Sequence, residues 1–470
     1  MRRTAMASAL AAALAGPALA ADDAVMAELK RLAARVEALE QQNQELKKAL
    51  ASERLSEKDP EIVSRIKYVE TQVDAIKGPA TKLADALDGV SVEGSLVAVA
   101  QRAGGGATTS GTRESRINYR GDVGVTLPVG SMGDQDGTLY AQVRLGQGNG
   151  VGLRPTYSST PNTVAFEKAE GADDSFAILA QAWYQLKVPL SNGARKEDAR
   201  EHLYLTVGKI DPFVFFDQNA AADDESAKFL NNVFVHNPLL DSGGDIGADA
   251  YGFQPGAVLR YENSRQKGGE WALSLGLFAS DAGANFSGSS RTSFVIGQAE
   301  MNTRWNYLPG AVRAYAWRNA RAASYDGAQR AHAGWGISTD QKVTESLTLF
   351  GRYGHHASGL VRFDRAITFG AELEGTPWRR SADSLGVAFG QLRTSSGFRL
   401  DSATVDGDGD GLADHGYMAT ASERQAELYY RFKLNDAVEL TPNLQWIGRP
   451  GGDASAPAVK LVGLRATLGF

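Results

Sequence analysis

The chain contains no cysteine, so its 470 residues must fold without disulfide bonds. Beyond the first twenty residues, no stretch of about 18 consecutive apolar residues occurs, which excludes membrane-spanning helices. The six histidines show no His-Glu-x-x-His spacing, and no serine lies in a Gly-x-Ser-x-Gly turn. The pair His355-His356 is expected to be solvated near an outer loop. These absences leave little support for an enzyme, and the net charge of −6 gives no indication of nucleic-acid binding.

Residues 1–20 have the features of a secretory signal. Arg2 and Arg3 precede a stretch rich in alanine and leucine, and Ala18-Leu19-Ala20 forms a small-x-small cleavage site. The apolar run is too short for a transmembrane helix. We therefore expect an exported protein.

Residues 21–80 are predicted to form a periplasmic α-helical coiled-coil stalk. Apolar residues follow alternating spacings of four and three, typical of the a and d positions of a coiled coil. They are Val25, Leu29, Leu32, Val36, Leu39, Leu46 and Leu50, with Asn43 in one a position. A homotrimer is predicted, although Asn at an a position also suits dimers. A single amphipathic helix packed on another element is the alternative, and contact with peptidoglycan stays open.

From Val90 onward the hydrophobic period changes to two, the period of a β-strand. In the last strand, Val462, Leu464 and Phe470 share an apolar face, whereas Arg465 and Thr467 are predicted to line water. Segment 178–188 is read as one unbroken alternation, with Leu179 on the same face as Gln181 and Trp183. A strand with one apolar and one polar face that ends at an aromatic carboxy terminus is typical of a membrane barrel.

About sixteen such segments occur between residues 90 and 470. They lie near 90–102, 115–127, 138–146, 176–188, 201–210, 256–263, 270–279, 292–305, 311–319, 331–340, 345–354, 365–376, 384–394, 424–434, 438–448 and 458–470. Short connections contrast with long ones at 147–175, 211–255 and 395–423. We therefore predict an all-β transmembrane barrel of about sixteen antiparallel strands, wide enough to hold an aqueous channel.

Several motifs then resemble the carbohydrate-selective porin family of the OprB type. They are Gly-Lys-Ile-Asp from 208, Phe-Phe-Asp-x-Asn-Ala from 215, Phe-Val-x-Asn-Pro from 234, Pro-Gly-Ala-Val-Leu-Arg-Tyr from 255 and Leu-Thr-Pro-Asn-Leu-Gln-Trp-Ile from 440. The resemblance covers residues 90–470 and implies an outer-membrane porin for passive diffusion of carbohydrates or other small hydrophilic solutes. The best-known sugar porins lack the stalk. A protein that tethers the outer membrane to the cell wall, and an outer-membrane hydrolase, are the alternatives.

Segment 207–241 is too long and too apolar for a solvated hairpin, so we expect it to fold into the barrel and narrow the lumen. Its aromatic residues would pack on the inner wall, while carboxylates and amides would bind sugar hydroxyls. The predicted constriction residues are Gln181, Trp183, Lys209, Asp211, Asp217, Asn219, Asp223, Asp224, Glu225, Asn231, Asn232 and Arg260. Lys209 and Arg260 would oppose the acids and set a transverse field. The alternative is that these polar residues only hold the loop through caps and salt bridges.

The sequence Asp-Gly-Asp-Gly-Asp-Gly from residue 406 has the ligand spacing of a calcium loop. The possible ligands are Asp406, Asp408, Asp410, Leu412 through its backbone, and Asp414. Tyr417 stands where an EF-hand has its bidentate Glu, and no helices are predicted on either side. The alternative is an acidic outer loop without an ion.

Overall fold

The computed structural model describes residues 41, 89–104, 108, 111–132, 135–153, 160–166, 175–190, 198–241, 245–246, 251–280 and 293–469. The predicted signal (1–20) and stalk (21–80) lie outside this set, apart from Gln41, which is helical. Phe470 also lies outside it. No helix among these residues is long and apolar enough to cross a membrane.

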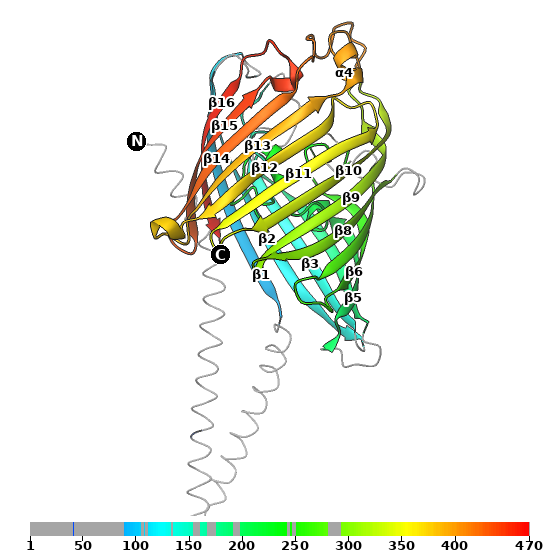
Figure 1. Ribbon diagram of the computed structural model, residues 1–470, viewed down its shortest axis with the longest axis vertical. Coiled ribbons are helices and arrows are strands. Elements are labelled where there is room, and N and C mark those ends of the chain that lie inside the picture. Colours follow the sequence, from blue (N-terminus) through cyan, green and yellow to red (C-terminus); the bar gives the residue numbers. More distant parts are fainter. Residues whose placement is uncertain are drawn as a thin grey trace, which may run out of the picture. The chain divides into compact units, whose positions relative to one another are not determined.

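Residues from Val90 onward form a unit of their own, a closed barrel of tilted antiparallel strands (Figure 1). The strands are β1 (Ser91–Ala103), β2 (Glu114–Met132), β3 (Gln135–Gln147), β4 (Phe176–Pro189), β5 (Glu201–Ile210), β6 (Gln254–Asn263), β7 (Trp271–Phe278), β8 (Phe294–Trp305), β9 (Leu308–Ala323), β10 (Gln329–Lys342), β11 (Leu347–Ser358), β12 (Phe363–Glu374), β13 (Ser384–Thr394), β14 (Glu423–Lys433), β15 (Val438–Gly448) and β16 (Val459–Gly469). Each strand pairs with its sequence neighbours, and β16 closes on β1 with Gly469 opposite Ser95. The predicted fold class and strand count are confirmed.

The connections differ in length at the two ends of the barrel. Turns such as 306–307, 343–346 and 434–437 join the strands at one end, here called the short-turn end. Connections 148–175, 211–253 and 395–422 join strands at the other, the long-loop end, where α4 (Ser396–Asp401) lies (Figure 1). Short turns on one side and long loops on the other are the rule in outer-membrane barrels.

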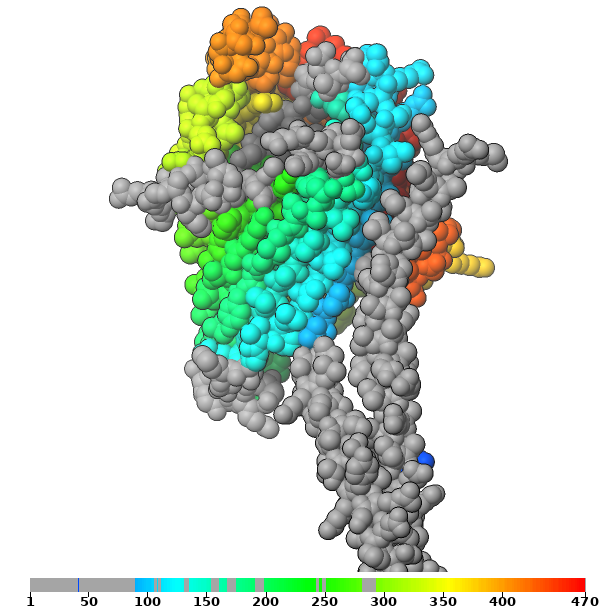
Figure 2. Space-filling model, turned by 180° about the vertical axis from the view of Figure 1, so that it is seen from behind, coloured from blue at the N-terminus to red at the C-terminus, as the bar shows by residue number. Residues whose placement is uncertain are grey.

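Alternate side chains of each strand face outward and inward because successive residues of a strand point to opposite faces. On β7, Leu273 and Leu275 are about half exposed, whereas Ala272 and Ser274 are buried. Val462 and Leu464 of β16 are likewise outward, as predicted. Seen from behind in Figure 2, the blue-to-green strands form one continuous tilted wall.

The alternation in β4 is broken, which corrects one prediction. A register shift lies between Gln142 and Val143 of β3, so Gln142 pairs with Gln181 but Val143 pairs with Leu179. Leu179 is 53% exposed on the outer face, whereas Gln181 is buried inside. The extra residue of a β-bulge reverses the faces beyond it, so one unbroken alternation over 178–188 is wrong.

Candidate channel constriction

The 211–253 connection, here called the inner loop, folds into the barrel as predicted. It begins with η3 (Pro212–Val214), whose N-cap Asp211 accepts a hydrogen bond from the Phe213 amide at 2.9 Å. A second short helix, α3 (Asn232–Val235), is capped by Asn231. Both caps satisfy helix-end amides that have no intrahelical partner.

One side of the inner loop supplies the apolar core of the barrel. Phe216, Phe229 and Phe234 are fully buried against the inner wall, where Phe229 contacts Phe350 and Tyr429. Each buried aromatic side chain contributes about 2 kcal/mol by leaving water. The apolar side of the loop therefore packs against the wall from β6 to β14, which leaves the remaining lumen on the side of β1 to β3.

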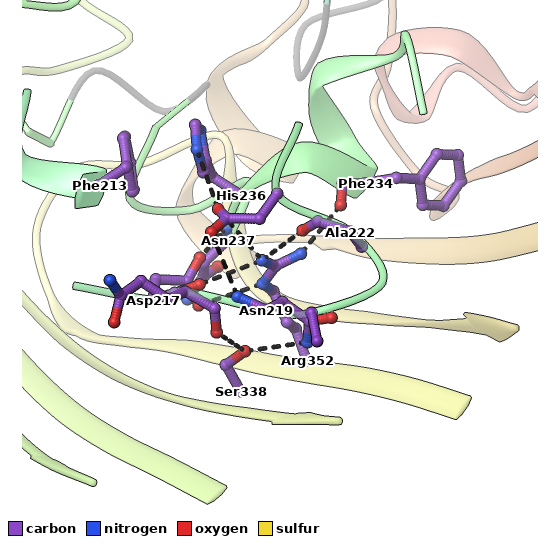
Figure 3. Close-up of polar contacts among 12 residues, drawn as sticks. Phe213, Asp217, Asn219, Ala222, Phe234, His236, Asn237, Ser338 and Arg352 are labelled. Carbon is purple, nitrogen blue, oxygen red and sulfur yellow. Dashed lines mark hydrogen bonds and ion pairs between the residues drawn. The ribbon is translucent and has the colours of Figure 1, made fainter. Parts of the chain in front are cut away.

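Asp217 and Arg352 form the central polar anchor beneath the inner loop (Figure 3). The Arg352 guanidinium lies 3.2 Å from Asp217 and donates to the carbonyls of Asp217, Ala222 and Phe234. Asp217 also accepts from the Tyr315 hydroxyl and the Asn237 amide, each at 2.6 Å. The charged groups of Asp217 and Arg352 are both buried, so the hydrogen bonds that they make within the protein hold the loop to the wall.

Asp217, Asn219 and Asn231 therefore do not face the channel, contrary to the sequence prediction. Asn219 donates to Ser338 of the wall, and Asn231 donates to two glutamines of β14 and β15. All three side chains are at most 4% exposed. Loop amides need partners inside the barrel, and these side chains provide them. The alternative reading, in which they hold the loop through caps and salt bridges, is correct for these three.

A second anchor joins Asp245 of the inner loop to β10 and β11. Its carboxylate lies 2.8 Å from His332 Nδ1 and 2.7 Å from His356 Nε2, and it accepts from the Trp317 indole at 2.8 Å. Burial opposes ionisation of Asp245, but His356 and His332 lower its pKa to about 2. His356 is buried, so the expectation that it is solvated is wrong. Its partner Asp245 lies more than a hundred residues away in the chain.

Residues 160–166 of the 148–175 connection also lie inside the barrel. The Thr163 amide donates to the Leu230 carbonyl, and the Asn232 amide donates to the Thr160 carbonyl, so this segment bridges to the inner loop. On the other side, Asn118 of β2 donates to the Val164 carbonyl. Two inward segments, rather than one, therefore narrow the lumen.

The closing strand holds the inner loop from its other edge, which corrects the prediction that Arg465 and Thr467 line water. Arg465 is 1% exposed and donates at 2.8 Å to the carbonyls of Glu225 and Lys228. Thr467 donates to the Ser226 carbonyl at 2.8 Å. Both residues do point inward, but the loop occupies the space in front of them.

Two cavities meet at one ring of charge inside the barrel. The larger, of about 690 Å³, lies towards the long-loop end and is lined by residues 160–166 and by the inner loop, including its last residues 251–253. The smaller, of about 300 Å³, is lined by Glu93, Tyr140 and other residues nearer the short-turn end. Arg120, Arg144 and Glu225 line both cavities. We call these three residues, with Asp122, the eyelet.

Every charge of the eyelet is paired and held in place. Arg120 lies 2.8 Å from Glu225 and 3.0 Å from Asp122, and Arg144 lies 2.6 Å from Asp122. Burial opposes ionisation of Glu225, but Arg120 and Arg144 lower its pKa to about 2, so the carboxylate is charged at neutral pH. Fixed, opposed charges at a constriction create a transverse field across the passing solute.

Four of the predicted inner-loop residues line the larger cavity, namely Asp211, Asp223, Glu225 and Asn232, and Asp224 lines the smaller one. Burial raises the pKa of Asp211 and raises that of Asp223 to about 7. His236 lies 2.9 Å from Asp241 and 3.5 Å from Asp223. Burial disfavours its cation, but Asp241 raises the pKa of His236 to about 9. Acids and His236 therefore share this part of the cavity wall, apart from the two arginines of the eyelet.

Gln181 and Trp183 extend the eyelet along the wall. Gln142 donates to Asp122 at 2.9 Å, Gln181 donates to Gln142 at 2.7 Å, and the Trp183 indole donates to Gln181 at 3.3 Å. Trp183 also stacks on Tyr140, with ring centroids 4.9 Å apart. These side chains form a ladder of oriented amides that ends in an aromatic pair.

Lys209 and Arg260 are not among the residues that line the two cavities, so the transverse field of the eyelet is set by other cations. Lys209 donates to the Leu179 carbonyl at 3.0 Å. Arg260 lies within 3.6 Å of Glu262 and Glu300 on the inner wall. The cations that do oppose Glu225 come from β2 and β3.

Sequence reasoning gave no role to Arg120, Asp122 or Arg144. A usable signal was present, because a charged residue in the middle of a membrane strand must face the lumen. Asp122 and Arg144 are direct cross-strand partners. The position of Glu225 opposite them depends on the path of the inner loop, which has no sequence period.

The acidic segment 406–414 lies exposed in the 395–422 connection. Carboxylate oxygens of Asp406, Asp408 and Asp414 lie within 4.8 Å of one another. Asp406 accepts from the amides of Gly409 and Gly411, and Asp410 accepts from the Leu412 amide. Calcium binding stays a prediction.

Comparison with known families finds a match to the carbohydrate-selective porin, OprB family, over residues 133–470. Among solved structures, OprB of Pseudomonas putida at high pH is similar, with a TM-score of 0.64 and 19% identity; the match covers 84% of this chain and 97% of that one. An anion-selective porin from Comamonas acidovorans aligns with a TM-score of 0.47 and 10% identity, over 81% of this chain and 99% of that one. No curated protein sequence matches the chain.

Proposed function

Because the chain belongs to the carbohydrate-selective porin, OprB family, it is an outer-membrane porin for small solutes, and we propose that the eyelet selects neutral carbohydrates. Family and fold are those of a channel rather than of an enzyme. The observation that carries this proposal is the pair of cavities that meet at Arg120, Arg144 and Glu225. A solute that crosses the lumen between them passes these side chains.

The chemistry of this route suits a hydroxylated ring. Guanidiniums donate hydrogen bonds, carboxylates and glutamine oxygens accept them, and a sugar hydroxyl does both. An aromatic side chain lies on each side of the eyelet. Tyr251 lines the larger cavity, and Tyr140, stacked on Trp183, lines the smaller one. A neutral sugar exchanges water for these groups, whereas an ion must also cross a field set by charges of both signs.

The inner loop is fixed to the wall, which suits passive diffusion through a constriction of constant width. Asp217, Asp245 and Asn231 each connect it to the barrel through several hydrogen bonds. Its apolar side is buried at the same time. Selection therefore depends on a rigid constriction and not on a moving gate.

Single-channel conductance of the full-length protein tests the proposal. We expect glucose or a glucose oligosaccharide to reduce the ion current, and a neutral non-sugar of similar size to have less effect. Glu225→Gln should weaken the sugar block and shift selectivity towards anions, since Arg120 then loses a counter-charge. Glu262→Gln removes the same charge from the inner wall away from the eyelet and serves as the control. If no sugar changes the wild-type current, the sugar-porin proposal fails.

For the amino-terminal part we propose that residues 1–20 direct export and that residues 21–80 form a periplasmic stalk. The heptad pattern supports a homotrimer, and such a stalk is suited to contact peptidoglycan. A tether between outer membrane and cell wall is then an additional role. Crosslinking of the full chain and of a variant lacking residues 21–80 tests both ideas. Loss of crosslinked trimers only in the shortened variant, with shed outer membrane, supports them; unchanged trimers contradict the oligomerisation role.

A further inference from the structure

A row of basic side chains crosses the outer face of the barrel at the long-loop end. Its members, here called the basic row, are Arg365 of β12, Arg393 of β13, Arg424 of β14, Lys460 of β16 and Arg102 of β1. Each lies one or two residues from the end of its strand. The strands are neighbours in the barrel, with β15 between β14 and β16 (Figure 1).

The alternation of the strands sets these side chains outward. Glu423 and Gln425 on either side of Arg424 are buried inside, and so are the neighbours of Lys460, namely Val459 and Leu461. Arg102 likewise lies between the buried residues Gln101 and Ala103. Arg365, Arg424, Lys460 and Arg102 are themselves exposed.

Members of the basic row on paired strands lie close to one another, whereas β15 separates Arg424 from Lys460. Arg365 and Arg393 are direct cross-strand partners, and Arg102 pairs with Val462, two residues from Lys460. Diagonal neighbours of this kind lie about 7–8 Å apart, within reach of long side chains. Facing like charges repel, so an arrangement of this kind favours an anion between them.

Four of the five cations have no partner among the residues that the structure describes. Arg393 is paired with Asp364. In the part of the chain that the structure describes, the side chains of Arg102, Arg365, Arg424 and Lys460 make no hydrogen bond or ion pair. Their charges are therefore available to a ligand outside the barrel.

An apolar band begins directly below the basic row. On the same outer face, Ile367 and Phe369 follow Arg365, and Val462 and Leu464 follow Lys460; all four are about half exposed. The equivalent stretch of β6, β7 and β8 carries Ala257, Leu277 and Val295 instead. On the arc of the basic row, positive charge above exposed apolar side chains matches an amphiphile with anionic groups above acyl chains.

We propose that the basic row binds the phosphate groups of a phosphorylated lipid in the outer leaflet. Arg365, Arg424 and Arg102 each present a planar fork of N–H donors that fits phosphate oxygens, and Lys460 adds a point charge. The acyl chains of the lipid lie against the apolar band. This arc of the barrel then holds a specific lipid, whereas the β6–β8 arc contacts lipid only through its tails.

The full-length protein in detergent micelles tests the proposal, with bisphosphorylated lipid A and the same lipid without phosphates as probes. The variant R102Q/R365Q/R424Q/K460Q removes the unpartnered charges. The control variant R265Q/K267Q/R318Q/R330Q removes as many positive charges elsewhere on the barrel. Each basic residue near an anionic lipid surface changes affinity by about fivefold, so we expect the row variant, which lacks four of them, to bind lipid A about 600-fold more weakly. The control should bind like the wild type.

Native mass spectrometry measures the bound lipid, and raised salt should weaken binding to the wild type but not to the row variant. Equal binding of lipid A and its dephosphorylated form by the wild type would overturn the proposal, as would equal losses in the two variants. That wild-type comparison needs no mutant, so the proposal stays testable even if the row variant fails to fold. Single substitutions of Arg424 and Lys460 then replace it.

Discussion

Replacing Arg352 by Met should release the inner loop while leaving the barrel intact. The substitution leaves the Asp217 carboxylate buried at 0% exposure without its cation, and it also removes the donors to the carbonyls of Ala222 and Phe234. Removing one partner of a buried ion pair costs about 3–5 kcal/mol. The cost falls on the loop because the strands keep their own hydrogen-bonded ladders. A cost of about 4 kcal/mol raises the population of detached loops by about 10³-fold.

Planar-bilayer recordings measure this effect as larger and noisier single-channel currents and a weaker block by sugar. Arg313→Met is the matched control, since Arg313 also pairs with two acids of the inner wall, Glu300 and Asp340, but does not contact the loop. A double-mutant cycle with Asp217→Asn isolates the pair. The reasoning is refuted if Arg352→Met conducts like the control and the cycle shows a coupling below about 0.5 kcal/mol.

Three further predictions concern charge. The pKa of Asp223 is raised to about 7, so its carboxyl group gains negative charge as the pH rises through neutrality. The cation selectivity of the wild type should therefore increase between pH 6 and pH 8, measured as the reversal potential in a salt gradient. In Asp223→Asn the selectivity should not change over this pH range. The pKa of Asp245 is lowered to about 2 in the folded protein. Its contribution to stability is therefore complete above the pKa of an unfolded aspartate, near 4, and is lost as the pH falls towards 2. The free energy of unfolding of the wild type should fall by about 2 kcal/mol over this range, and an equal loss in Asp245→Asn would contradict this assignment. Calcium should protect the 406–414 loop from proteolysis and a chelator should remove the protection; Asp406→Asn should lose the effect, and protection that does not depend on calcium would count against the site.

The barrel could be predicted from sequence because its rule is local. A strand has a period of two, so Val462 and Leu464 could be assigned to the outer face from their spacing alone. The period-two rule fails where a β-bulge adds one residue to a strand, because the residues beyond the bulge then face the opposite side. Leu179 is such a residue, and nothing in the β4 sequence marks the bulge. The rule gives the direction of Arg465 but not what lies in front of it.

The inner loop shows where sequence reasoning stops. Its apolar content correctly predicted that it folds inside, because so many aromatic side chains cannot remain in water. Asp217 and Asp223 are the same residue type six positions apart, yet one is buried under the loop and the other lines the larger cavity. An irregular segment has no period that assigns its faces. The contacts of Asp245 with His332 and His356 depend on the same three-dimensional path.

Arg465 and Thr467 hold the backbone of residues 225–228, so the eyelet depends on the strand that closes the barrel. The same β16 pairs with β1 along the seam and donates to the Glu225 carbonyl inside the lumen. The closure of the wall and the width of the pore therefore depend on one strand.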